Sequence, residues 1–306
     1  MFLFYWFIWG ANVSRGTLKK DQLSKNKVFL NCKDYTVSNE RFDLVLDESL
    51  EMLITTPQPS LANLGKYYQS ESYISHTDSK QSLFDKLYQF VKTITIKKKV
   101  KLLSKESDVS SSEKTLLDVG CGTGDFLVAC KNKQWKITGV EPNMKAKETA
   151  ELKLKETIVS DFSEIKSQTF DCITMWHVLE HIPDLTNYIA SLKKILKPKG
   201  TLFIAVPNYK SYDAQFYKEF WAAYDVPRHL WHFSKKSISL LFKKEKMKVV
   251  KQLPMKFDSY YVSLLSEKYK RGRSNPIRAF WTGFRSNSLA KHTKEYSSII
   301  YVIKNE

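Results

Sequence analysis

The stretch TLLDVGCGTGDF, residues 115–126, decides how this chain folds. Its first half is an apolar run typical of a buried strand, and a helical pattern begins where it ends. Between the two stand Gly120, Gly122 and Gly124. Glycine lacks a Cβ atom, so the backbone can turn sharply there and a ligand can approach it closely. The stretch therefore predicts a strand, a ligand-facing turn and a helix.

The segments around this stretch alternate in the same way. A helix is predicted at 83–103, and strands at 115–120, 136–142, 157–162, 170–176 and 201–208 are separated by helices at 125–133, 143–155 and 184–197. Such βαβ units build a doubly wound parallel sheet. The tail adds a helix at 235–247, a strand at 248–255, a helical insertion at about 258–290 and a strand at 296–305. We expect the last strand to pair antiparallel at the sheet edge.

The acids near the glycine loop indicate its ligand. Dinucleotide-binding loops place a third glycine where this chain has Asp125, and a carboxylate facing a pyrophosphate would repel it. S-adenosylmethionine has no phosphate and carries a sulfonium cation, so it suits an acidic site. Glu141 ends the second strand, where it can accept the ribose hydroxyls, and Asp118 ends the first, where it can hold the ammonium group. Asp161 ends the third strand and can accept the adenine amino group, with Phe162 beside the ring.

With these residues the chain resembles class I S-adenosylmethionine-dependent methyltransferases. The resemblance is carried by LLDVGCGTGDFL (116–127), GVEPN (139–143), VSDF (159–162), FDCITMWHVLEHIPD (170–184) and KPKGTLFIAVPN (197–208). Within that superfamily it is similar to the branch that includes ubiquinone-biosynthesis-type O-methyltransferases. The resemblance implies a Rossmann-like, mostly parallel seven-stranded sheet with an antiparallel last strand, and methyl transfer to an acceptor, expected at oxygen.

The resemblance also implies a set of site residues and a domain organisation. Cofactor contacts are expected from Asp118, Gly120, Cys121, Gly122, Gly124, Glu141, Pro142, Asp161, Phe162, Trp176 and His177. The methyltransferase domain is expected at 83–306, with its cofactor-binding core at 115–208 and a substrate-covering loop at 209–234. The acceptor is expected to be a small molecule or a glycan or lipid precursor.

Residues 1–82 are expected to form a separate, partly disordered N-terminal segment. Some relatives carry a zinc-binding segment with paired cysteines here, and residues 31–59 keep its general shape but contain only Cys32. The four cysteines of the chain form no C-x-x-C pair, so we expect no bound metal. The apolar start MFLFYWFIWGA is about half of the ~20 residues that cross a bilayer, so we expect a cytoplasmic protein without stable membrane insertion.

The stretch WHVLEHIPD, residues 176–184, contains the H-x-x-E-H pattern of one class of zinc peptidases. That pattern requires a continuous helix, whereas a strand precedes His177 and Pro183 follows closely. We therefore expect a loop after the fourth strand, beside the cofactor. His181 in this loop and His229 in YDVPRHLWHFS (224–234) are candidate catalytic bases for a hydroxyl acceptor. A structural hydrogen bond that braces the loop is the alternative for each.

The net charge of +17 raises the possibility of an RNA substrate. The basic residues are 42 Lys and only 7 Arg, and readers of phosphates and bases favour Arg. The one dense run, KKKVK at 97–101, is typical of a solvated helix face. The place after the fourth strand holds HVLE where RNA methyltransferases usually carry a motif such as N-P-P-Y. Nucleic acid is therefore disfavoured as a partner, with an RNA methyltransferase, a non-catalytic binding module and a zinc peptidase through His177, Glu180 and His181 left as alternatives.

Overall fold

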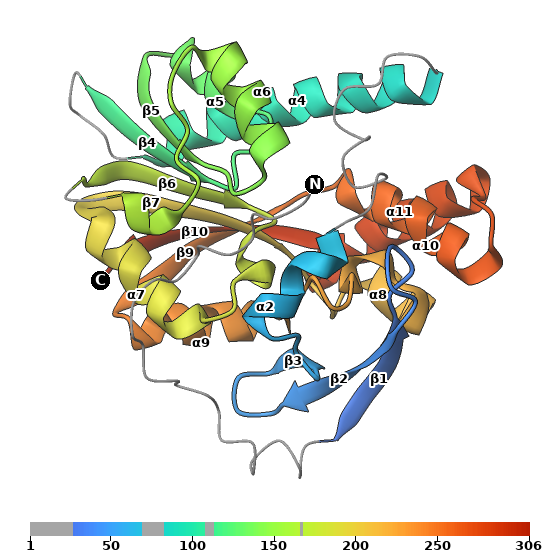
Figure 1. The fold of residues 1–306 in the computed structure, drawn as a ribbon. Helices are drawn as coiled ribbons and strands as arrows, with labels where there is room; N and C mark the ends of the chain where they lie inside the picture. Colours follow the sequence, from blue (N-terminus) through green and yellow to red (C-terminus); the bar gives the residue numbers. More distant parts are fainter. Residues whose placement is uncertain (1–26, 69–82, 108–112, 166–167) are drawn as a thin grey trace.

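The computed structural model describes residues 27–68, 83–107, 113–165 and 168–306 (Figure 1). Within these ranges the main sheet has six strands, in the order β5 (Trp135–Val140), β4 (Lys114–Val119), β6 (Phe170–Trp176), β7 (Leu196–Pro207), β10 (Ser298–Asn305) and β9 (Met247–Pro254). The first four are parallel, and β10 runs antiparallel to both of its neighbours. This arrangement confirms the predicted doubly wound, mostly parallel fold.

Two strand predictions need correction. The segment predicted as the third strand, 157–162, contributes only a single bridge between Val140 and Val159. It pairs no further because the Glu164 carboxylate accepts the N–H groups of Ser160 and Asp161, and a 3-10 helix begins at Phe162. The predicted count of seven strands is therefore not reached in the described residues. The last strand lies inside the sheet, between β7 and β9, and not at its edge.

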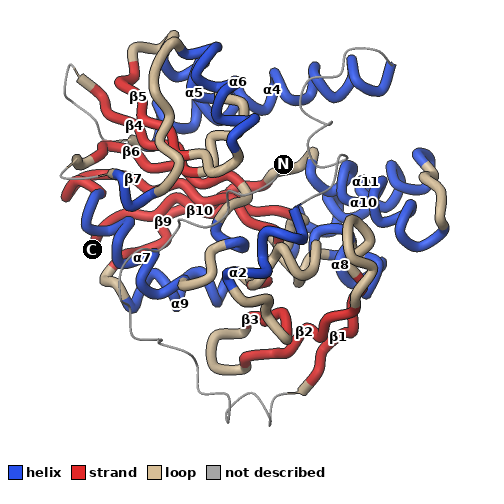
Figure 2. The backbone as a smooth tube through the Cα atoms, viewed as in Figure 1, coloured by secondary structure: helices blue, strands red, loops and turns tan. Residues whose placement is uncertain are grey.

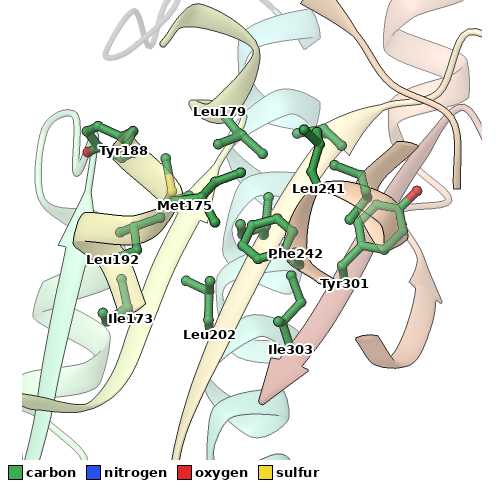
Figure 3. Packing of buried hydrophobic residues seen from close by; sticks show 14 of the residues in the cluster. Ile173, Met175, Leu179, Tyr188, Leu192, Leu202, Leu241, Phe242, Tyr301 and Ile303 are labelled. Carbon is green, nitrogen blue, oxygen red and sulfur yellow. The ribbon is translucent and has the colours of Figure 1, made fainter. Parts of the chain in front are cut away.

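Helices cover both faces of this sheet (Figure 2). Helices α4 (Leu83–Glu106), α5 (Asp125–Lys131) and α6 (Met144–Leu154) pack on one face through one apolar cluster. Helices α7 (Leu185–Ile195) and α9 (Lys235–Lys244) pack on the other face. Figure 3 shows this second cluster, in which Leu192 and Phe242 lie against strand residues such as Leu202. On β4, β7 and β10 neighbouring residues such as Leu116 and Leu117 belong to different clusters, as the pleat requires.

A smaller antiparallel sheet packs beside the main one. It contains β1 (Val28–Lys33), β2 (Arg41–Asp47), β3 (Met52–Thr56) and the short β8 (Trp231–His232). Helix α2 (Leu61–Leu64) and a 3-10 turn, η1 (Gly65–Tyr68), follow β3. The predicted substrate-covering loop contains α8 (Tyr212–Tyr217), two 3-10 turns at 218–220 and 222–224, and β8. Since β8 completes the small sheet, the N-terminal segment is joined to this loop. The apolar start of the chain lies outside the described residues.

The predicted helical insertion is a hairpin of α10 (Asp258–Arg271) and α11 (Pro276–Thr293). It lies between β9 and β10 in the sequence and projects at the end of the molecule away from β4 and β5 (Figure 1). In the part of the chain that the structure describes, no helix is both long enough and apolar enough to cross a membrane.

Candidate active site

The glycine loop leaves the carboxyl end of β4. Gly120 adopts φ +71°, and the N–H groups of Gly120 and Cys121 donate to the Val140 carbonyl at 2.8 and 3.0 Å. A Cβ on Gly120 would lie 2.5 Å from Val178, which explains the need for glycine. At Gly122 a Cβ would meet no described atom within 4 Å. The loop is therefore packed at its first glycine and open to a ligand at its second.

Glu141 and the glycine loop are bonded to each other. The Glu141 carboxylate accepts the N–H of Gly122 through Oε2 and that of Asn143 through Oε1, both at 2.8 Å. Burial raises the pKa of Glu141, and the two N–H groups oppose that shift. Pro142 follows directly and is half-buried. The carboxylate is thus fixed beside Gly122 with lone pairs left for two hydroxyl donors.

Asp161 has one bonded and one unbonded oxygen. Its Oδ1 accepts the N–H of Ser163 at 2.7 Å, whereas the buried Oδ2 has no hydrogen-bond partner among the described residues. Phe162 follows it and packs against Tyr188, with ring centroids 4.8 Å apart. A buried carboxylate oxygen without a partner is costly unless a donor satisfies it. An amino group on a ring beside Phe162 fits this requirement.

Asp118 lies buried at the end of β4. Thr174 on β6 donates its hydroxyl to Asp118 Oδ1 at 2.6 Å. Burial raises the pKa of Asp118, while this hydrogen bond and the charge of Lys99 act against the shift. Lys99 lies 4.1 Å above the Trp176 ring. A cationic ligand group beside Asp118 would be stabilised by the same carboxylate.

Two sequence interpretations change here. Asp125 forms ion pairs with Lys92 at 2.7 Å and Lys153 at 2.9 Å, so its carboxylate is neutralised by lysines and is not free to repel a ligand. In the KKKVK run, Lys97, Lys98 and Lys101 are exposed as expected, but Lys99 faces Asp118 and Trp176.

Gly124, the third glycine of the loop, is the N-cap residue of α5. It adopts φ +79° and packs against Ala150.

His177 follows Trp176 at the end of β6 with φ +58°. Its Nε2 lies 3.0 Å from Asp258 Oδ2 and its Nδ1 lies 3.4 Å from Glu180 Oε1. Burial alone would lower the pKa of His177, but the two carboxylates outweigh it and raise the pKa to about 10. His177 is therefore a cation that links the β6 loop to the first turn of α10.

Glu180, His181 and His229 form a cluster whose ligand-type atoms all lie within 4.8 Å of one another. The single turn at Leu179–His181 confirms that no long helix follows His177. The Arg228 carbonyl accepts from His181 Nδ1 at 3.0 Å and the Ala223 carbonyl accepts from His229 Nδ1 at 2.9 Å, so each Nε2 keeps its lone pair. Tyr68 Oη lies 3.0 Å from the same His181 nitrogen.

The electrostatics of this cluster favour a neutral His181 beside an ionised Glu180 carboxylate. Burial and His229 lower the pKa of His181 to about 4. Burial opposes ionisation of Glu180, yet the neighbouring histidines hold its pKa below the usual value. Apart from the contact of Oε1 with His177 Nδ1 at 3.4 Å, the Glu180 carboxylate has no hydrogen-bond partner in the described ranges. The cluster could accept a proton or hold one divalent cation; the prediction of no bound metal stays a prediction.

The loop at 224–234 does not bring all its polar residues to this cluster. His232 Nε2 lies 3.0 Å from Thr55 Oγ1 in the small sheet. Arg228 is buried and bonded to Asp34 and Asp225. His229 is thus the one histidine of this loop that joins Glu180 and His181. Lys99, Tyr68 and Asp258 also contact the candidate site, and no motif in the sequence indicated this. Each comes from a helix or turn that is distant in the sequence.

The comparisons with known proteins identify the class. Residues 89–252 match a methyltransferase domain family, so the chain belongs to that family. The predicted membership of a methyltransferase family is thereby confirmed.

Particular relatives agree with this class. Ubiquinone biosynthesis O-methyltransferase of Histophilus somni (strain 2336) is 34% identical over 110 residues, which are 32% of this chain and 46% of that protein. The protein of the same name from Saccharophagus degradans is 32% identical over 106 residues, with 45% of it covered. The chain thus spans less than half the length of these relatives. Magnesium protoporphyrin IX methyltransferase (ChlM) from Synechocystis PCC 6803, solved with bound SAH, is 12% identical and covers 78% of this chain and 97% of its own, with a TM-score of 0.52. That likeness concerns the fold alone.

Proposed function

We propose that this chain transfers a methyl group from S-adenosylmethionine to a hydroxyl oxygen of a small-molecule acceptor. One observation carries the proposal: the open glycine, the fixed Glu141 carboxylate and the unbonded Asp161 oxygen follow neighbouring segments at one edge of the sheet. The Glu180–His181–His229 cluster adjoins them, because Val178 packs on Gly120. The name of the similar O-methyltransferases supports oxygen as the acceptor atom.

In this proposal three carboxylates bind the cofactor, and a histidine accepts the proton of the acceptor. Glu141 would hold the ribose hydroxyls, Asp161 the adenine amino group and Asp118 the ammonium group. The bound cofactor supplies an electrophilic methyl group. His181 or His229 would accept the hydroxyl proton at Nε2, and the Glu180 carboxylate would stabilise the imidazolium that forms. The remaining task is to hold the acceptor oxygen in line with the methyl carbon and exclude water.

Calorimetry with S-adenosylmethionine and its demethylated product tests the binding part. Glu141→Gln and Asp161→Asn should each weaken binding by about tenfold or more, because each loses a hydrogen bond to a charged acceptor. Glu156→Gln is the matched control, since Glu156 is exposed and pairs only with Lys131 among the described contacts. Wild-type affinity in both site variants would show that the cofactor assignment is wrong.

Transfer of labelled methyl groups to a panel of acceptors tests the chemistry. The panel contains phenols, glycan precursors, lipid precursors and RNA. His181→Ala and His229→Ala should lower turnover while leaving the cofactor dissociation constant within about twofold. Unchanged turnover in both variants would remove the base assignment. Salt-dependent methylation of RNA would favour the RNA alternative, and stoichiometric zinc with peptide cleavage would favour the peptidase.

A further inference from the structure

The hairpin of α10 and α11 has its small residues inside and its large apolar residues outside. The buried positions of α11 are Ala279, Thr282, Gly283, Ser286 and Ala290, and those of α10 include Ser259, Ser263 and Ser266. The opposite side of α11 carries Ile277, Phe280, Trp281 and Phe284, which are 74, 54, 61 and 48% exposed. We call these four residues the aromatic face. A helix of a water-soluble domain normally turns such residues toward the core.

The small residues let the two helices approach closely. A Cβ on Gly283 would lie 2.8–3.0 Å from Tyr260, and Ser259 donates its hydroxyl to the Gly283 carbonyl at 3.2 Å. The side of α11 that carries Ile277, Trp281 and Phe284 therefore lies opposite the packed side of the helix, while Phe280 at its border stacks on Tyr260 of α10 with ring centroids 5.5 Å apart. Small residues between helices with large apolar residues outside are typical of helices that face lipid.

The segment that carries the aromatic face has an excess of positive charge. Residues 268–294 contain no Asp or Glu and eight cations: Lys268, Lys270, Arg271, Arg273, Arg278, Arg285, Lys291 and Lys294. Four of the seven arginines of the chain lie in this segment. Glu267 pairs with Arg271 at 2.9 Å and with Arg278 at 3.4 Å. At helical spacing Arg278 and Arg285 border the aromatic face, so apolar and cationic groups would meet the same surface.

We propose that the aromatic face binds the surface of an anionic bilayer, with α11 lying in the interface. Exposed Trp and Phe beside Arg and Lys suit the boundary between headgroups and acyl chains. An aliphatic side chain as exposed as Ile277 suits acyl chains better than the charged phosphates that dominate contacts to nucleic acid. Asp258, the first residue of α10, bonds to His177, so the hairpin joins the edge of the sheet that carries the candidate site. The proposal is independent of the methyl transfer proposed above.

Co-sedimentation of the full chain with vesicles tests this proposal. We expect binding to vesicles of phosphatidylcholine with phosphatidylglycerol, and weaker binding to phosphatidylcholine alone. Trp281→Ser with Phe284→Ser should lower the affinity by about tenfold or more, because two large side chains no longer bury in lipid. Leu152→Ser is the matched control, since Leu152 is 80% exposed on α6. Arg273→Gln with Arg285→Gln should reduce binding to the anionic vesicles only, whereas Arg41→Gln should not.

Three results would overturn the proposal. The first is no binding to anionic vesicles at low salt. The second is that the Trp281→Ser, Phe284→Ser variant binds vesicles as tightly as the wild type. If removal of residues 1–11 abolishes vesicle binding in the same assay, the binding belongs to that segment and not to the aromatic face. The third is that the wild-type chain forms a dimer in sedimentation equilibrium whereas this variant is a monomer. That result would assign the aromatic face to contact with a second copy of the chain. Cofactor affinity measured on the same variants separates these results from failure of the proposed function.

Discussion

His177 combines a left-handed backbone with two acidic partners. Its φ of +58° is uncommon for a residue other than Gly, and the contacts to Asp258 and Glu180 hold it there. The same contacts make it a fixed cation beside the candidate cofactor site. Its role is therefore to position the loop that carries Glu180 and His181, and its protonation should matter to stability.

The pH dependence of stability tests this role. The pKa of His177 is raised from 6.5 to about 10, so the stabilisation is complete below pH 6.5 and is lost as the pH rises toward 10. His177→Asn tolerates the left-handed backbone but carries no charge. We expect the difference in unfolding free energy between wild type and this variant to shrink across that window in urea titrations. In an Asp258→Asn background the pH dependence should be weaker; equal dependence in both backgrounds would refute the pairing.

Thr174 should tune the cofactor affinity through Asp118. Its hydroxyl donates to the buried carboxylate, so Thr174→Val removes a bond that favours the ionised form and raises the pKa of Asp118 further. If Asp118 holds an ammonium group, binding at pH 7 should weaken by about tenfold and recover in part at higher pH.

The matched control lies on the strand that carries Asp118. Thr115 at the start of β4 donates its hydroxyl to Asp171 at 2.7 Å, at the opposite edge of the sheet. Thr115→Val should lower stability and leave the affinity measured by calorimetry unchanged. Equal losses of affinity in the two Thr→Val variants would mean that the effect is one of stability alone.

At the scale of elements, the cofactor-binding core could be predicted from the sequence because each of its motifs lies within one short stretch. Asp118, Glu141 and Asp161 each end an apolar stretch, and neighbouring parallel segments end at one edge, so their meeting follows from the pattern. The third strand failed because Glu164 takes backbone donors that a sheet would need. The position of β10 and the approach of Lys99 and Asp258 depend on long-range packing, which no short stretch encodes.

Arg228 joins two elements that are far apart in the sequence. Its buried guanidinium lies 3.0 Å from Asp34, at the turn after β1, and 2.6 Å from Asp225, and it donates to the Tyr67 carbonyl at 2.9 Å. Arg228→Met should destabilise the fold by about 3–5 kcal/mol, because two carboxylates lose their buried partner. Arg41→Met, at an exposed arginine, is the control and should change stability by less than about 1 kcal/mol. Equal melting shifts in the two variants would contradict the role of Arg228.

At the scale of the molecule, the two sheets share the region of the candidate site. His229 and His232 come from one loop, and His229 faces Glu180 whereas His232 meets Thr55 of the small sheet. The predicted boundary at residue 83 therefore lies between segments that are joined through β8 and Arg228. The acceptor side of the candidate site would depend on both sheets.

This connection predicts that the two sheets unfold as one unit. We expect amide protons of β2 and β3 to exchange by an opening reaction as costly as that of β6, since separation would expose the buried Arg228, Asp34 and Thr55 groups together. Native-state hydrogen exchange at rising urea concentrations measures these opening free energies. In Arg228→Met the small sheet should open at lower cost than β6, because its buried ion pairs are gone while the apolar core of the main sheet is unchanged. Faster exchange of β2 and β3 than of β6 in the wild type would show instead that the N-terminal segment is an independent unit.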